Sequence, residues 1–128
     1  ILMMKTDPTY VGGLANFYTG QKQYDKAFQL FEESIQKNPN DFLSIYQYGR
    51  TCAVSGQRLE KGEEYLKKYL TTYTPKLNEP SHAGAHMRLA QIYEKKGNKK
   101  EAKRLYELAV KSDGNLKEAK EGLERVSK

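Results

Sequence analysis

The same spacing of small and large residues occurs three times in this chain. A large residue followed by a small one opens each copy, at Leu14-Ala15, Tyr48-Gly49 and Leu89-Ala90. Leu14 and Tyr48 are 34 positions apart, which is the length of a repeat made of two helices and a short turn. Such a unit cannot bury its apolar face alone, so the period predicts a stack of helix pairs.

The three copies resemble the tetratricopeptide repeat, whose pattern is W-x-x-L-G-x-x-Y, then A-x-x-x-F, then P. This resemblance implies an all-α fold, an α-solenoid of antiparallel helix pairs that form a right-handed superhelix. The A-x-x-x-F motif is matched by Ala27-x-x-x-Phe31, Gly62-x-x-x-Leu66 and Ala102-x-x-x-Tyr106. The closing proline is matched by Pro39 in the first copy and Pro75 in the second, and the third copy has none.

Capping residues and apolar spacing predict where the helices begin and end. Asp7 and Ser81 are expected N-caps, and Asn98-x-x-Glu101 resembles a capping box. The expected helices lie at about 8–19, 24–37, 41–54, 59–72 and 81–96, then after Asn98, and at 116–126. We expect a single domain over 1–128, with repeats at about 8–40, 41–80 and 81–114 and a capping helix at 115–127.

The middle unit departs from the spacing of the other two. Tyr48 and Gly62 are 14 positions apart, where the first and third units have 13, so its turn should hold one extra residue. From Gly62 to Ala102 there are 40 positions, about six more than one period. We expect the additional residues around 71–80, in a lengthened surface loop or an overlong helix.

Small residues recur where the two helices of a pair should cross. A larger side chain there would push the helix axes apart, because interiors are closely packed. The small residues of the first helices therefore face those of the second, and the expected pairs are Ala15 with Ala27, Gly49 with Gly62, and Ala90 with Ala102.

Composition excludes several classes of protein but does not reveal the compartment. Cys52 is the single cysteine, so neither an intramolecular disulfide nor a zinc ribbon can form, and we interpret it as a core thiol. No apolar run is long enough for a membrane span. Because the chain begins with Ile1 rather than methionine, we expect it to be either a trimmed chain or a segment of something longer.

One pair of histidines has the spacing of metal ligands. His82 and His86 are four positions apart on one expected helix, but Ala83 stands where the catalytic zinc motif has glutamate. No third ligand is evident, and no nucleophile with a base can be identified. We therefore expect no metal, no cofactor and no enzymatic activity.

The resemblance implies that the first helices of successive pairs line a concave groove that binds a segment of a protein or peptide partner. Amides there can bond a peptide backbone, and arginines can pair with carboxylates. The residues expected to line this groove are Asn16, Thr19, Tyr46, Gln47, Arg50, Met87, Arg88, Gln91 and Glu94.

One subfamily of these repeats binds the C-terminal carboxylate of chaperones with lysines and asparagines in the groove. Asn16 and Arg88 match two of those positions, and Gln47 approximates a third. Gly12 and Gly84 stand where the lysines would be. We therefore do not expect binding of chaperone tails.

Two other functions compete with the groove. A net charge of +6 and a basic cluster in the third repeat could bind nucleic acid or another polyanion, although single-strand binders also expose stacking aromatics. Alternatively, the chain is a structural segment of a longer array, and the apolar residues 1–4 allow self-association through that end. The members of the basic cluster are Lys95, Lys96, Lys99, Lys100, Lys103 and Arg104.

Overall fold

The computed structural model describes residues 8–128, with side chains described from Gly12 onward. Its helices follow the expected boundaries to within about two residues, and no strand occurs among the described residues. The expected cap Asp7 and the apolar residues 1–4 lie outside this range. The helices are α1 (Pro8–Gly20), α2 (Tyr24–Lys37), α3 (Phe42–Ser55), α4 (Leu59–Thr72), α5 (His82–Lys95), α6 (Lys99–Ser112) and α7 (Lys117–Val126).

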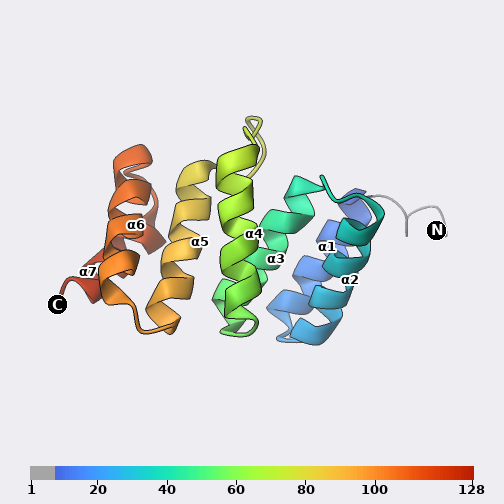
Figure 1. Cartoon of the computed structure of the whole chain (residues 1–128), viewed down its shortest axis with the longest axis horizontal. Coiled ribbons are helices and arrows are strands. Elements are labelled where there is room, and N and C mark those ends of the chain that lie inside the picture. Colours follow the sequence, from blue (N-terminus) through green and yellow to red (C-terminus); the bar gives the residue numbers. More distant parts are fainter. Residues whose placement is uncertain (1–7) are drawn as a thin grey trace.

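The helices stack side by side in chain order as an α-solenoid of antiparallel pairs (Figure 1). Along the stack α1 contacts α3, α3 contacts α5 and α5 contacts α7. In contrast, α2, α4 and α6 do not contact one another within residues 8–128. We call α1, α3, α5 and α7 the inner layer, because closer spacing on one side curves the stack toward that side.

Side-chain caps fix the start of three helices. The Asp41 carboxylate accepts a hydrogen bond from the Ser44 backbone N–H at 3.2 Å, and Ser81 Oγ accepts one from Gly84 at 3.1 Å. Asn98 accepts from the backbone of Glu101 at 3.1 Å, although the Glu101 carboxylate turns to Arg104 instead of completing the capping box. Local sequence therefore determines these boundaries.

The extra residue of the middle unit lies in the α3–α4 turn, as its spacing predicts. Each turn within a pair has a residue of positive φ in the left-handed region: Lys22, Gly56 or Gly97. One residue separates it from the next helix in the first and third turns. In the second turn there are two, Gln57 and Arg58, and Arg58 itself has a φ of 52°.

Arg58 contacts both α2 and α3 from this unusual position. Its guanidinium donates to Glu32 at 2.9 Å and to the Tyr48 hydroxyl at 3.0 Å, and it lies 4.3 Å from the centre of the Phe28 ring. A left-handed conformation costs about 1 kcal/mol for a non-glycine residue. These contacts to α2 and α3 offset that cost.

The other additional residues form a loop between α4 and α5, since α4 is no longer than its neighbours. This loop projects beyond the helix ends at the top of Figure 1. The Tyr73 hydroxyl and the Lys76 backbone N–H both donate to the Glu79 carboxylate, at 2.7 and 2.8 Å. The Tyr69 hydroxyl donates to the Pro80 carbonyl at 2.6 Å. Side-chain bonds thus give the loop a defined path.

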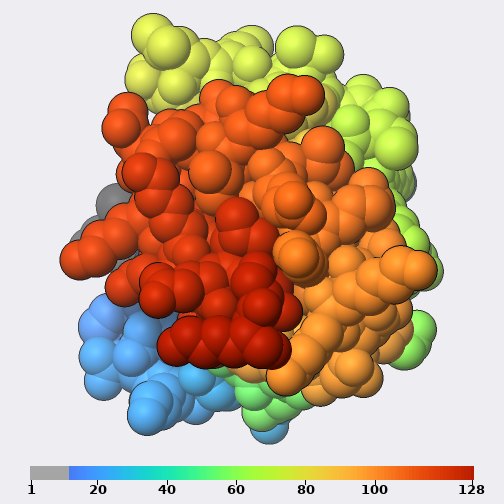
Figure 2. All heavy atoms as spheres, turned by 90° about the vertical axis from the view of Figure 1, so that its left-hand side faces the viewer, coloured from blue at the N-terminus to red at the C-terminus, as the bar shows by residue number. Residues whose placement is uncertain are grey.

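Small residues permit close approach of the helices. A Cβ added to Gly62 of α4 would lie 2.5 Å from the Cys52 Cβ of α3 and 2.9 Å from the Ile92 Cδ1 of α5. A Cβ on Gly122 of α7 would lie 2.3 Å from the Tyr106 ring of α6. These two glycines therefore set the spacing at three helix contacts of the stack. Figure 2 shows the C-terminal end, where α7 (red) lies beside α6 (orange).

Candidate partner-binding groove

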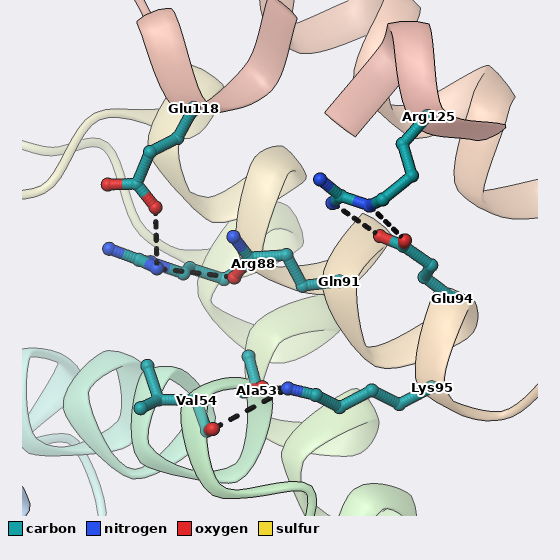
Figure 3. A pocket seen from close by; sticks show the side chains of 8 residues that line it. All are labelled: Ala53, Val54, Arg88, Gln91, Glu94, Lys95, Glu118 and Arg125. Carbon is teal, nitrogen blue, oxygen red and sulfur yellow. Dashed lines mark hydrogen bonds and ion pairs between the residues drawn. The ribbon is translucent and has the colours of Figure 1, made fainter. Parts of the chain in front are cut away.

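The inner layer contains a pocket of about 440 Å³ between α3, α5 and α7 (Figure 3). Polar and charged side chains of α5 and α7 form most of its wall, and the end of α3 forms the rest. The lining residues are Ala53, Val54, Arg88, Gln91, Glu94, Lys95, Glu118 and Arg125. Three of them, Arg88, Gln91 and Glu94, belong to the residues that the sequence predicts for the groove.

Arg88 is the most enclosed cation of this pocket. Its side chain is only 14% exposed, and Nη1 donates to Gln91 Oε1 at 3.2 Å. The Glu118 carboxylate lies 3.6 Å from the same nitrogen. Arg88 Nε is buried without a partner among the described residues. Because a buried cation is costly unless it is bonded, this guanidinium retains capacity for an acceptor.

Arg50 of α3 lies next to Arg88. Its only side-chain partner among the described residues is the Asn16 amide oxygen, at 3.5 Å. Burial lowers the pKa of the Arg50 guanidinium, and the positive charge of Arg88 lowers it further, while the Glu118 carboxylate acts in the opposite direction. Two guanidiniums from adjacent inner helices therefore share one nearby carboxylate.

A second pocket of about 400 Å³ lies between α1 and α3. Its lining includes two predicted groove residues, Asn16 and Gln47, together with Leu43, which is 41% exposed. Gln47 Oε1 is buried and has no partner within the described residues. The hydrogen bond between Asn16 and Arg50 joins this pocket to the arginine pair. We call the two pockets and the arginine pair between them the inner groove.

Glu94, another predicted groove residue, is occupied by the capping helix. Its carboxylate accepts hydrogen bonds from Arg125 of α7, at 2.9 Å for Nη2, and from the Tyr106 hydroxyl at 2.8 Å. The Arg125 bond lowers the pKa of Glu94. This carboxylate therefore holds α7 in place.

Lys95 also lines the pocket, and its ammonium group bonds the end of α3. Its Nζ donates to the carbonyl of Ala53 at 2.6 Å and lies 3.5 Å from that of Val54 (Figure 3). These carbonyls lie in the last turn of α3, where cations are favourable. Lys95 thus joins the second repeat to the third.

Three predicted groove residues are buried, which corrects that part of the prediction. Thr19 is 4% exposed, and its hydroxyl lies 3.3 Å from that of Thr51. Tyr46 is 6% exposed and packs against the Tyr69 ring, with 5.3 Å between ring centres. Met87 is 4% exposed. Thr19 thus lies against α3, and Tyr46 lies against α4.

Sequence reasoning missed the contribution of α7 to the groove. The sequence predicts only a capping helix here, yet Glu118 and Arg125 of this helix both reach α5. They are seven positions apart, which places them on one side of the helix two turns apart. That spacing is the signal in the sequence, although it does not tell which neighbour the side faces.

Half of the basic cluster makes polar contacts within the protein, and two of its six members pair with carboxylates. Lys96 pairs with Glu60 at 2.8 Å and with Glu63 at 2.9 Å, and Arg104 pairs with Glu101. Lys95 bonds backbone carbonyls, as described above. The remaining members are exposed lysines at the start of α6: Lys99, Lys100 and Lys103.

His82 contacts the loop before α5, and Cys52 is buried in the core. His82 Nε2 lies 2.7 Å from the Tyr73 carbonyl, and no group of three potential metal ligands occurs among the described residues. Burial raises the pKa of the Cys52 thiol to about 12. No helix between residues 8 and 128 is both long and apolar enough to cross a membrane.

Comparisons with known proteins agree with this architecture. Two family models, each described as a tetratricopeptide repeat, match residues 12–38 and 83–116. The human protein O-mannosyl-transferase TMTC2 is 26% identical over 102 residues, a match that covers 78% of this chain. The chain spans only 12% of the length of that relative.

The fold also resembles that of a solved structure, the Sgt2 TPR domain from Aspergillus fumigatus. The TM-score is 0.78 at 22% identity, over 95% of this chain and 78% of the Sgt2 chain. Domains of this kind are scaffolds for protein–protein interaction. With its three helix pairs, its closing helix and matched repeats at 12–38 and 83–116, the chain is built of tetratricopeptide repeats.

Proposed function

We propose that this protein binds an extended segment of a partner protein in the inner groove and has no catalytic role of its own. The observation that carries the proposal is a pair of guanidiniums in the inner layer: Arg88 lines the first pocket, and the half-buried Arg50 bonds Asn16, which lines the second. Guanidinium groups bind carboxylates in a bidentate manner. An acidic side chain of the partner would lie at this pair.

The amides on either side suit a peptide backbone. Asn16 and Gln47 lie toward α1, and Gln91 lies on α5. An amide group both donates and accepts, so each can bond the N–H or C=O of an extended chain. Apolar contact would come from Leu43 and Val54, which are 41% and 40% exposed. These groups support recognition along the whole groove.

The relative named as a transferase does not change this proposal, because the match covers 12% of that protein. In the second pocket the Ser44 hydroxyl donates to the Asp41 carboxylate at 2.7 Å, and the same carboxylate caps the start of α3, so we interpret this pair as structural. Repeat domains of this type occur within larger proteins as binding modules. We therefore assign a binding role to the segment.

Site-directed photo-crosslinking with a peptide selected from a random library tests this function. The photoreactive amino acid benzoylphenylalanine replaces Val54 in the inner groove or, as the control, Leu108 on α6. Both native side chains are exposed to a similar extent, 40% and 37%. The proposal expects crosslinking of the selected peptide at position 54 and little at 108. Equal crosslinking at both positions, or crosslinking at 108 alone, would contradict it.

A further inference from the structure

The capping helix places a carboxylate where the proposed partner's carboxylate would bind. Glu118 of α7 lies 3.6 Å from Arg88 Nη1 and acts electrostatically on Arg50 as well. In Figure 3 its side chain points down from α7 toward Arg88, across the pocket. The free groove therefore contains an acidic side chain of the protein itself.

The two partners of this ion pair differ in how much each gains from it, because Glu118 is exposed and Arg88 is enclosed. The Glu118 side chain is 63% exposed, whereas that of Arg88 is 14% exposed. Exposed carboxylates gain little from a single ion pair, but an enclosed guanidinium needs an acceptor. A partner carboxylate that also reaches Arg88 Nε would satisfy a nitrogen that Glu118 leaves without a bond.

The Glu118 side chain can move away from Arg88 while α7 stays packed against the protein. The helix is held by the buried residues Ala119, Gly122 and Val126 and by the bonds between Arg125 and Glu94. Rotation of the Glu118 side chain into solvent breaks only its contact with Arg88. The groove is thus preformed, and only one side chain has to move.

We infer that Glu118 is an intramolecular substitute for a partner's acidic side chain and that it determines which segments bind. This inference rests on the proposed function and identifies the partner segment as acidic. Arg50 and Arg88 carry two positive charges that one carboxylate does not neutralise. A segment with neighbouring acidic residues replaces Glu118 and pairs with both guanidiniums, whereas a neutral segment gains nothing from replacing it.

The test uses fluorescein-labelled hexaglutamate as the probe and hexaserine as the neutral comparison, with fluorescence anisotropy at low salt. Glu118→Gln removes the competing charge and keeps the shape of the side chain. Glu121→Gln is the matched control, because Glu121 is an exposed residue of the same helix and its loss changes the net charge equally. Circular dichroism establishes that each variant is folded.

We expect Glu118→Gln to bind hexaglutamate about two to five times more tightly than wild type, the factor that corresponds to a surface ion pair of about 0.4–1 kcal/mol. Glu121→Gln should match wild type, and hexaserine should bind none of them. Equal affinities of the two glutamine variants overturn the inference, as does the absence of hexaglutamate binding to Glu118→Gln.

Arg88→Ala separates this inference from the proposed function. If Arg88→Ala weakens hexaglutamate binding while Glu118→Gln leaves it unchanged, the groove binds acidic segments and Glu118 does not compete. If Arg88→Ala has no effect on either the hexaglutamate or the library-selected peptide, the proposed function itself is wrong.

Discussion

Replacing Gly62 by alanine would test how closely three helices pack in the middle of the stack. Gly62 is buried on α4, and an added Cβ would lie 2.5 Å from the Cys52 Cβ and 2.9 Å from the Ile92 Cδ1. Carbon atoms in favourable contact are about 3.5–4.0 Å apart. The Cys52 Cβ is bonded to the backbone of α3 and cannot rotate away, so α3 and α4 must separate by about 1 Å.

Two opposing effects determine the size of the change. Alanine favours a helix interior by about 1 kcal/mol over glycine. Overpacking of a buried contact costs about 1–3 kcal/mol, and the fixed Cys52 Cβ places this site near the upper limit. We therefore expect Gly62→Ala to lower the free energy of unfolding by about 2 kcal/mol, which corresponds to a decrease in Tm of about 6–8 °C.

Urea unfolding followed by far-UV circular dichroism measures this difference. Gly13→Ala is the matched control, because Gly13 lies on α1, is exposed, and an added Cβ would have no atom within 4 Å. That variant should be more stable than wild type, by up to about 1 kcal/mol. The reasoning is refuted if Gly62→Ala is as stable as wild type or more stable.

Two further predictions concern single side chains. Because burial raises the pKa of Cys52 to about 12, the native protein should resist alkylation by iodoacetamide at pH 8 and react once unfolded; rapid alkylation of the native protein would argue against a core thiol. Burial opposes ionisation of Glu63, but hydrogen bonds from Lys67 and Lys96 lower its pKa to about 2 in the folded protein, below an ordinary value of 4.5. The ionised carboxylate therefore stabilises the fold above about pH 4.5 and loses this effect as the pH falls toward 2. Glu63→Gln should cost about 1 kcal/mol at pH 7 and almost nothing at pH 2, as measured by urea unfolding, and an equal loss at both pH values would be inconsistent with this account.

The helix boundaries could be predicted because their signals are local. Asp41 and Ser81 bond the backbone three residues ahead, so the cap is visible in the sequence itself. The spacing also located the extra residue near Arg58. The spacing alone does not indicate whether the residues around 71–80 extend a helix or form a loop. The loop depends on hydrogen bonds from Tyr69 and Tyr73 to residues beyond the end of α4.

The groove was less predictable because it depends on contacts between helices. The period indicates which helices form the inner layer, and Arg50 and Arg88 lie on two of those helices. How far a neighbouring helix covers a flank depends on their crossing angle, which left Thr19 and Tyr46 buried. The position of Glu118 depends on how α7 packs, and no repeat spacing specifies that.

The affinity of the library-selected peptide for the Arg50→Ala/Arg88→Ala variant tests the central claim most directly. Lys100→Ala/Lys103→Ala is the control, because it removes the same charge from the exposed start of α6. Loss of two charge-assisted contacts should weaken binding by at least about tenfold in the arginine variant and little in the lysine variant. The affinity of the wild-type protein for the peptide should depend only weakly on salt. Unchanged affinity of the arginine variant, or a loss confined to the lysine variant together with a wild-type affinity that falls steeply as salt rises, would contradict binding in the inner groove.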